Sequence, residues 1–167
     1  MVIDMNNGIV GYKAFYKGLF NRFEEKFEIG KRYVIDYKYR NYGYHFCKNM
    51  EDVLVYYRGE DIEICEVIGS GDIINYHNDY YGVYDVYASS EIEIVRKIDR
   101  EEIINMVLNM NPFSVDRVVR FVSLYVLTYD EIKLFEDRYA KYDGVMDAIN
   151  YYQKKDKKVY KRKYINN

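Results

Sequence analysis

Histidine and cysteine are the residues of this chain with the most evident capacity for chemistry, and there are two of each. His45 and Cys47 are two positions apart, so their side chains would share one face of a strand, and Cys65 and His77 follow later. Zinc accepts two thiolates and two imidazoles, but its ligands usually come in closely spaced pairs that this chain lacks. Attack by Cys47 would need a base and a third group to orient it, which a strand does not supply. We therefore expect no metal site, and two free, partly buried thiols.

Carboxylates could supply acids and bases, and one neighbouring pair is the most enzyme-like. Glu91 and Glu93 would share one face of a predicted strand beside Ser89 and Ser90, although a solvated edge strand has the same pattern. Gly69-Ser70-Gly71 follows a predicted strand but lacks the lysine and the helix start of phosphate-binding loops. These motifs do not make a credible active site, so the sequence favours a protein that is not an enzyme and has no cofactor.

Short strands are predicted over the first hundred residues, and they carry most of these side chains. Runs rich in Val, Ile, Tyr and Phe predict strands at residues 9–16, 33–37, 42–46, 62–68, 83–87 and 92–98. Asn49, with Asp52 three residues later, predicts the N-terminus of a helix over 50–57. Gly69-Ser70-Gly71 is expected to end the fourth strand in a turn, and 75–82 to form a polar loop.

Helical patterns replace strand patterns after residue 99. Asp99 with Glu102, Ser114, and Thr128 with Glu131 are candidate caps. The helices are expected at 99–110, 114–127, 129–142 and from about 144 onward. Apolar residues nearly encircle the axis of 114–127, which predicts a central buried helix.

The expected fold class is α+β, with an N-terminal mixed or antiparallel sheet that contains one inserted helix. A C-terminal helical subdomain of three to four helices follows. The chain of 167 residues is expected to form a single domain (1–167), with a β-rich half (1–98), a helical half (99–152) and a basic tail (153–167).

Tyrosine is unusually abundant, with 22 Tyr against 8 Phe and no Trp. One interpretation is codon drift in an AT-rich genome, with Tyr in place of Phe at half-buried positions. The other is a contact surface, because Tyr is enriched in binding interfaces.

Charge is distributed unevenly along the chain. Residues 153–167 contain seven basic residues and one acidic residue, a net of +6, which leaves −8 on the other residues of a chain with net charge −2. A basic tail can be a nucleic-acid-contacting arm or a solvated helix end. An acidic body with a basic tail could also form a head-to-tail homodimer.

The apolar runs are much shorter than the roughly 20 residues that span a bilayer, and the N-terminus lacks the pattern of a signal peptide. We therefore expect no membrane contact and a location in the cytoplasm of a host bacterium.

The first hundred residues resemble a family of small proteins and domains, found mostly in phages and mobile elements, that is catalogued as a domain of unknown function. The resemblance covers about residues 9–98 and is carried by Gly11-Tyr12-Lys13-Ala14-Phe15, Gly30-Lys31-Arg32-Tyr33, Gly43-Tyr44-His45-Phe46-Cys47 with Asn49, Glu51-Asp52-Val53-Leu54-Val55-Tyr56-Tyr57, Glu66-Val67, Gly71-Asp72-Ile73 and Ala88-Ser89-Ser90-Glu91-Ile92-Glu93-Ile94. This family implies no particular activity.

The chain is more remotely similar to ADP-ribosyltransferase-like folds, in which a glycine-aromatic strand precedes a helix and a Glu lies on a late strand. This similarity implies that Tyr44 or His45 would face a nicotinamide pocket and that Glu91 or Glu93 would be the acid, with NAD as cofactor. Lys13 stands where such enzymes usually have a His or Arg.

The function expected from these features is that of a non-catalytic phage or mobile-element accessory protein. It would bind and inhibit a host protein or ribonucleoprotein complex that handles nucleic acid, such as a CRISPR effector. The expected contacts are Glu60, Asp61, Tyr76, Tyr80, Tyr81, Lys154, Lys158, Tyr160 and Tyr164. The alternatives are an ADP-ribosyltransferase-like enzyme that modifies a host protein, and a nucleic-acid-binding protein that uses the basic tail.

Overall fold

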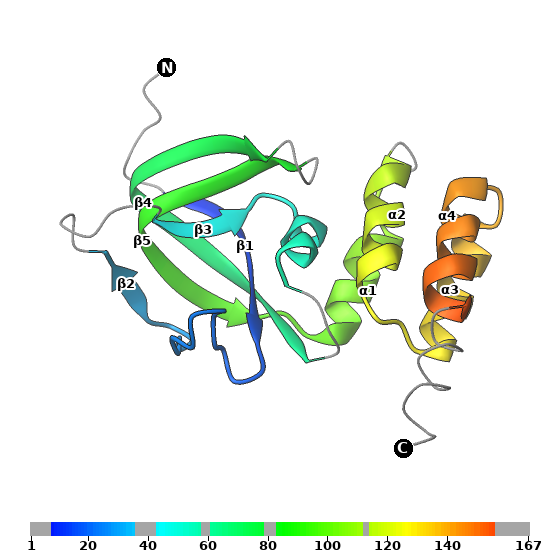
Figure 1. The fold of residues 1–167 in the computed structure, drawn as a ribbon, viewed down its shortest axis with the longest axis horizontal. Helices are drawn as coiled ribbons and strands as arrows, with labels where there is room; N and C mark the ends of the chain where they lie inside the picture. The colour runs from blue at the N-terminus through cyan, green and yellow to red at the C-terminus, as the bar shows by residue number, and fades with distance from the viewer. Residues whose placement is uncertain (1–7, 36–42, 58–60, 79–82, 112–113, 156–167) are drawn as a thin grey trace. The chain divides into compact units, whose positions relative to one another are not determined.

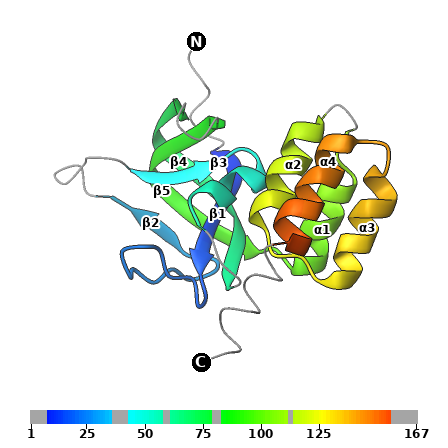
Figure 2. The same cartoon turned by 45° about the vertical axis from the view of Figure 1, so that its right-hand side comes forward.

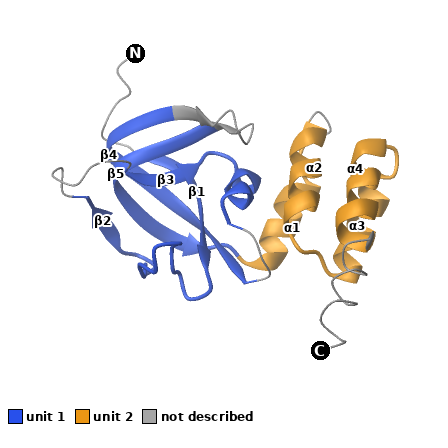
Figure 3. Cartoon of the chain, viewed as in Figure 1, with its two compact units in different colours: residues 1–57, 61–98 blue, residues 58–60, 99–167 orange. Residues whose placement is uncertain are grey.

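The computed structural model divides into two compact units (Figures 1 and 3). The first, which we call the β unit, comprises residues 1–57 and 61–98, and the second, the helical unit, comprises 58–60 and 99–167. The structure describes residues 8–35, 43–57, 61–78, 83–111 and 114–155. Antiparallel strands followed by helices confirm the predicted α+β class.

The β unit is an antiparallel sheet that closes on itself. Its elements are β1 (Ile9–Tyr16), β2 (Arg32–Val34), β3 (Tyr44–Cys47), a 3-10 helix (Met50–Val55), β4 (Ile62–Asn78) and β5 (Val83–Lys97). The strand order is β2-β5-β3-β1-β4, and β4 also pairs with β5, so that β1, β4, β5 and β3 form a ring like that of a small barrel. Figures 1 and 2 show β4 and β5 as the two longest strands, lying side by side.

The predicted turn at Gly69-Ser70-Gly71 is wrong, because β4 continues through it to Asn78. Ser70 pairs with Glu91 and Ile73 with Ser89, so two residues of β4 lie opposite one residue of β5, which defines a β-bulge. Gly71 has φ +74, a conformation that favours glycine, so the glycine bends the strand without ending it.

Two other boundaries differ from the predictions for the same reason. The predicted loop at 75–82 is wrong over 75–78, which belong to β4, while 79–82 lie outside the described residues. The separate strands predicted at 83–87 and 92–98 are one strand, β5. A bulged long hairpin carries the same glycine and polar signals as a pair of turns.

The core of the β unit is built around the ring of Phe46 on β3. Gly11 and Gly69 lie against this ring, since a Cβ added at Gly11 would be 2.6 Å from it and one added at Gly69 would be 2.2 Å from it. Tyr87 stacks on the ring, with centroids 5.5 Å apart. The buried residues of this core are Phe15, Phe27, Phe46, Cys65, Val67, Ile92 and Ile94.

The helix predicted after Asn49 is present, but it is a 3-10 helix of six residues, Met50–Val55. Asn49 occupies the N-cap position with extended backbone, as predicted. Its side chain makes no capping bond to the backbone, and its Nδ2 donates to Asp52 Oδ2 at 3.0 Å.

The helical unit contains α1 (Arg100–Leu108), α2 (Val115–Leu124), α3 (Tyr129–Tyr139), α4 (Asp143–Ala148) and a π-helical segment (Ile149–Lys155). The predicted capping box at Thr128 is confirmed: Glu131 N–H donates to Thr128 Oγ1 at 3.3 Å, and Thr128 N–H donates to Glu131 Oε2 at 2.7 Å. Asp99 and Ser114 also occupy N-cap positions, without side-chain capping bonds. Arg100 pairs with Glu131 and so ties α1 to α3.

Helix α2 is shorter and less buried than predicted. It ends at Leu124 because Tyr125 adopts an extended conformation, and only Val118, Phe121 and Val122 of the helix are buried, while Asp116 is exposed. The prediction that this helix is buried on all sides is therefore wrong, because its valine side chains outside the buried face are partly exposed. The buried face packs on α4 and the π-helical segment (Figure 2).

Gln153 of the π-helical segment satisfies the backbone at the end of α2. Its Nε2 donates to the carbonyl oxygens of Val122 and Tyr125, and its Oε1 accepts from Leu127 N–H at 3.1 Å. The side chain is 4% exposed.

Over the part of the chain that the structure describes, no helix is long and apolar enough to cross a bilayer.

A candidate anion-binding cavity in the β unit

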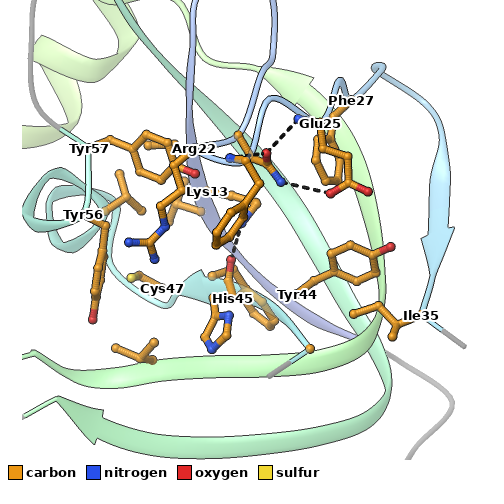
Figure 4. Close-up of a pocket in the computed structure, with 18 residues that line it drawn as sticks. Lys13, Arg22, Glu25, Phe27, Ile35, Tyr44, His45, Cys47, Tyr56 and Tyr57 are labelled. Carbon is orange, nitrogen blue, oxygen red and sulfur yellow. Dashed lines mark hydrogen bonds between the residues drawn. The ribbon is translucent and has the colours of Figure 1, made fainter. Parts of the chain in front are cut away.

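A cavity of about 430 Å³ opens where β1 and β3 diverge (Figure 4). These strands pair at a single position, Tyr12 with Cys47, and the walls beyond it come from the 3-10 helix and from the connection between β1 and β2. The polar lining includes Lys13, Arg22, Glu25, His45 and Cys47, and the aromatic lining includes Tyr12, Phe23, Phe27, Tyr44, Phe46, Tyr56 and Tyr57. Cavities of this size hold small ligands or single side chains.

Glu63 of β4 anchors the start of the connection. Its Oε2 accepts hydrogen bonds from the backbone N–H groups of Gly18 and Leu19, at 2.8 and 3.0 Å. Leu19 has φ 61, which is strained for a residue with a Cβ, so the carboxylate holds the chain in this turn. Burial would raise the pKa of Glu63, but the hydrogen bonds from Lys97 and Leu19 lower it.

Asn21 then folds the connection over the cavity. Its Oδ1 accepts from the N–H groups of Phe23 and Glu25, both at 2.9 Å, and its Nδ2 donates to Glu25 Oε2 at 3.0 Å. These bonds form a turn that places Arg22 in the cavity wall, and Figure 4 shows its guanidinium pointing toward β3.

Lys13 is a half-buried cation in the floor of the cavity. Its Nζ donates to the backbone oxygen of His45 at 2.8 Å and lies 5.6 Å from the ring of Phe15 (Figure 4). Within the described residues, neither Lys13 nor Arg22 has an ion pair. Burial, with a smaller contribution from Arg22, lowers the pKa of Lys13 from 10.5 to about 8, while Cys47 and Glu25 oppose the shift.

His45 is neutral at physiological pH. Burial and, to a smaller extent, the charges of Lys13 and Arg22 lower the pKa of its imidazole to about 4, against a hydrogen bond to the backbone of Gly43. The cations that the cavity offers at neutral pH are therefore Lys13 and Arg22.

We expect His45 to destabilise the protein in acid. Its pKa is about 4 in the folded protein and 6.5 as a model value, so it has no effect above pH 6.5 and its cost grows as pH falls toward 4. Because the ring is partly exposed, we expect about 1 to 2 kcal/mol, less than the full shift would give. Urea unfolding followed by circular dichroism should show that His45→Asn loses that much less stability than wild type between pH 7 and 4.5. Equal losses would contradict the prediction.

The structure brings two of the sequence-predicted catalytic candidates into this cavity and leaves the other two outside it. Tyr44 and His45 line it. Glu91 and Glu93 alternate along β5 with Ile92 and Ile94, which are in the core, so the carboxylates point to the opposite face. Glu91 instead forms an ion pair with Arg32.

The predicted contact residues that the structure describes belong to both units. Asp61 is exposed in the β unit, Tyr76 lies in β4, and Lys154 is exposed in the helical unit and pairs with Glu136. The others lie outside the described residues: Glu60, Tyr80, Tyr81, Lys158, Tyr160 and Tyr164.

Cys47 and Cys65 are not joined by a disulfide, as predicted, but both are fully buried and not partly buried. Burial raises the pKa of Cys65 to about 12, which makes it a poor nucleophile. In the parts of the chain that are described, no group of three or more His, Cys, Asp or Glu side chains could hold a metal ion.

Arg22 and Glu25 are site residues that the sequence reasoning missed. They belong to a connection without periodicity, and its position depends on Glu63, which is distant in the sequence. The available signal was Lys13, a charge inside the otherwise apolar run of β1.

Comparison with known proteins leaves the activity of this cavity open. No curated protein and no solved structure gives a significant match. A family model, described as a domain of unknown function, matches residues 9–106, which include every residue that lines the cavity. Because this match spans more than half of the chain, the protein belongs to the DUF7666 family.

Proposed function

We propose that this protein is a non-catalytic binding protein and that the cavity of the β unit takes up an anionic group of its partner. The observation that carries the proposal is the Lys13 ammonium. It lies in the cavity floor with one hydrogen-bond acceptor, the His45 carbonyl, and with no carboxylate paired to it among the described residues.

An anion would complete this environment. An ammonium has three N–H donors, and the structure assigns one of those of Lys13. Arg22, in the wall of the same cavity, adds a planar set of donors that suits carboxylate, phosphate or sulfate groups. The aromatic side chains that line the rest of the cavity favour an anion attached to an apolar or planar body.

The first test is a titration of the full chain with benzenesulfonate, which stays anionic from pH 6 to 10 and carries a ring. We expect amide NMR shifts to concentrate at Lys13, Arg22 and His45. Lys13→Gln should weaken binding about tenfold or more, because it removes a charge-assisted hydrogen bond. Affinity should also fall as pH rises through about 8, where Lys13 loses its proton.

Lys48→Gln is the matched control. Lys48 Nζ also donates to a strand carbonyl, that of Val10 at 3.2 Å, but Lys48 is exposed and does not line the cavity. Its variant should bind benzenesulfonate like wild type. Shifts spread over the surface lysines, or equal losses in the two variants, would rule out the cavity as an anion site.

The wider role that we propose is that of a phage or mobile-element accessory protein that inhibits a host nucleic-acid-handling complex, such as a CRISPR effector. Such a complex offers phosphates and acidic side chains, which an anion-binding cavity suits. Tagged protein should retain one stoichiometric host complex at low salt and lose it at high salt. The Lys13→Gln variant should retain less of this host complex than the Lys48→Gln variant. Equal retention by the two variants would show that binding of the host complex does not depend on the cavity.

ADP-ribosyl transfer is the second candidate, favoured by the presence of Tyr44 and His45 in one cavity. Lys13 and Arg22 could hold the pyrophosphate of NAD, and Glu25, not Glu91 or Glu93, is the carboxylate that lines the cavity. This candidate predicts NAD consumption in the presence of host proteins, abolished by Glu25→Gln and kept by Glu91→Gln. An unchanged NAD concentration would exclude it.

A further inference from the structure

We propose that Lys13 is a nucleophilic amine that captures the carbonyl group of an anionic aldehyde or ketone as a reversible imine. The inference rests on the proposed anion site and adds the class of ligand that the site would hold. Its basis is the position of Lys13 Nζ in a cavity large enough for a small molecule, beside a second cation and without an ion pair among the described residues.

Lysines become nucleophiles when burial or a neighbouring cation favours the neutral amine. Both conditions hold for Lys13, which is half-buried and has Arg22 across the cavity. The groups of opposite effect are Cys47 on β3 and Glu25 on the connection, and Glu25 forms no ion pair with the ammonium.

Because its pKa is lowered, Lys13 has a much larger fraction of neutral amine than a surface lysine has. With a pKa of about 8 instead of 10.5, the neutral fraction of the amine at pH 7 is about 300 times larger. Surface lysines are therefore poor competitors for a carbonyl compound, even though they are more exposed.

The reaction balances without an oxidant or reductant. The nitrogen lone pair of Lys13 forms a C–N bond as the carbonyl π bond opens, and a proton moves from nitrogen to oxygen to give a carbinolamine. The C–O bond then breaks, water leaves with a second proton, and a C=N bond forms. The neutral His45 imidazole lines the same cavity and can carry these protons. A protonated imine keeps one N–H, which can still donate to the His45 carbonyl.

Pyridoxal 5′-phosphate is a suitable probe, because its aldehyde, its phosphate and its ring match the amine, the Arg22 guanidinium and the aromatic lining of the cavity. Pyridoxine 5′-phosphate is the matched compound, with a hydroxymethyl group in place of the aldehyde. The full chain would be mixed with limiting pyridoxal phosphate at pH 7, reduced with borohydride and mapped by peptide mass spectrometry.

We expect the reduced adduct on Lys13, at a level at least tenfold above that on any other lysine. Lys13→Arg should abolish that adduct, because a guanidinium does not form the imine. Lys48→Arg should leave the Lys13 adduct unchanged.

Two negative results have different meanings. Binding of pyridoxine phosphate at the cavity, with adducts spread evenly over the lysines, would overturn the imine and leave the anion site intact. Absence of binding by pyridoxine phosphate and benzenesulfonate alike would overturn both proposals.

Discussion

Replacing Gly69 by alanine is expected to destabilise the β unit by about 2 to 3 kcal/mol, the upper part of the range for overpacked cores. The added Cβ would be 2.2 Å from Phe46 Cε1 and 3.0 Å from Ser89 Oγ, so the ring has to move. Gly11 lies against another side of the Phe46 ring, which limits where the ring can move. The ring also stacks on Tyr87, so a shift would disturb this aromatic contact as well. Urea unfolding of the full chain, monitored by circular dichroism, would measure the loss.

The cause can be isolated by repeating the substitution beside a smaller neighbour. In a Phe46→Leu background the clash is largely removed, so Gly69→Ala should cost at least about 1 kcal/mol less than it does in wild type. Hydrogen exchange should show the loss of protection in the strands around Phe46. If the cost is the same in both backgrounds, the close approach of ring and glycine is not what constrains position 69.

Replacing Gln153 by alanine is expected to destabilise the helical unit by about 3 kcal/mol, because each buried backbone group left without a partner costs about 1 to 3 kcal/mol. This side chain donates to the carbonyl oxygens of Val122 and Tyr125 and accepts from the N–H of Leu127. Gln153→Glu should be at least as damaging above neutral pH, because a carboxylate has no donor for the two carbonyls.

Asn150→Ala provides the control for Gln153, since Asn150 is an exposed residue of the same π-helical segment. We expect it to change the free energy of unfolding by less than about 0.5 kcal/mol, as is usual for surface positions. Faster exchange of the Leu127 amide in Gln153→Ala would locate the effect. Stability within that margin for both Gln153 variants would show that water replaces the side chain.

Local signals predicted much of the fold. The first strand, 9–16, follows from its apolar pattern, and the capping box of Thr128 and Glu131 follows from residue spacing alone. The errors arise where tertiary contacts decide between local alternatives. A glycine such as Gly71 is compatible with a turn and with a bulge, and pairing with β5 selects the bulge.

The candidate site was predicted only where it lies on a regular element. Tyr44 and His45 follow from the strand that carries them. Arg22 could not be placed from its neighbours, because the turn that holds it is fixed by the Glu63 carboxylate from another strand. The buried end of α2 is similar, since nothing near Tyr125 in sequence indicates that Gln153 satisfies its carbonyl.

Closure of the sheet has a consequence for self-association. Exposed strand edges are templates on which another chain can add a strand, and closure removes them. In the described part of the β unit, β2 is paired on one side only, and its three residues, which include Arg32, offer little to a second chain. Residues 73–78 of β4 pair with β5 alone among the described residues, because the pairing of β4 with β1 ends at Gly69. Where β1 and β3 diverge, Lys13 already occupies the His45 carbonyl oxygen. We therefore expect that any strand added by a second copy of this protein pairs with residues 73–78 of β4, and not with β2 or with the diverging parts of β1 and β3.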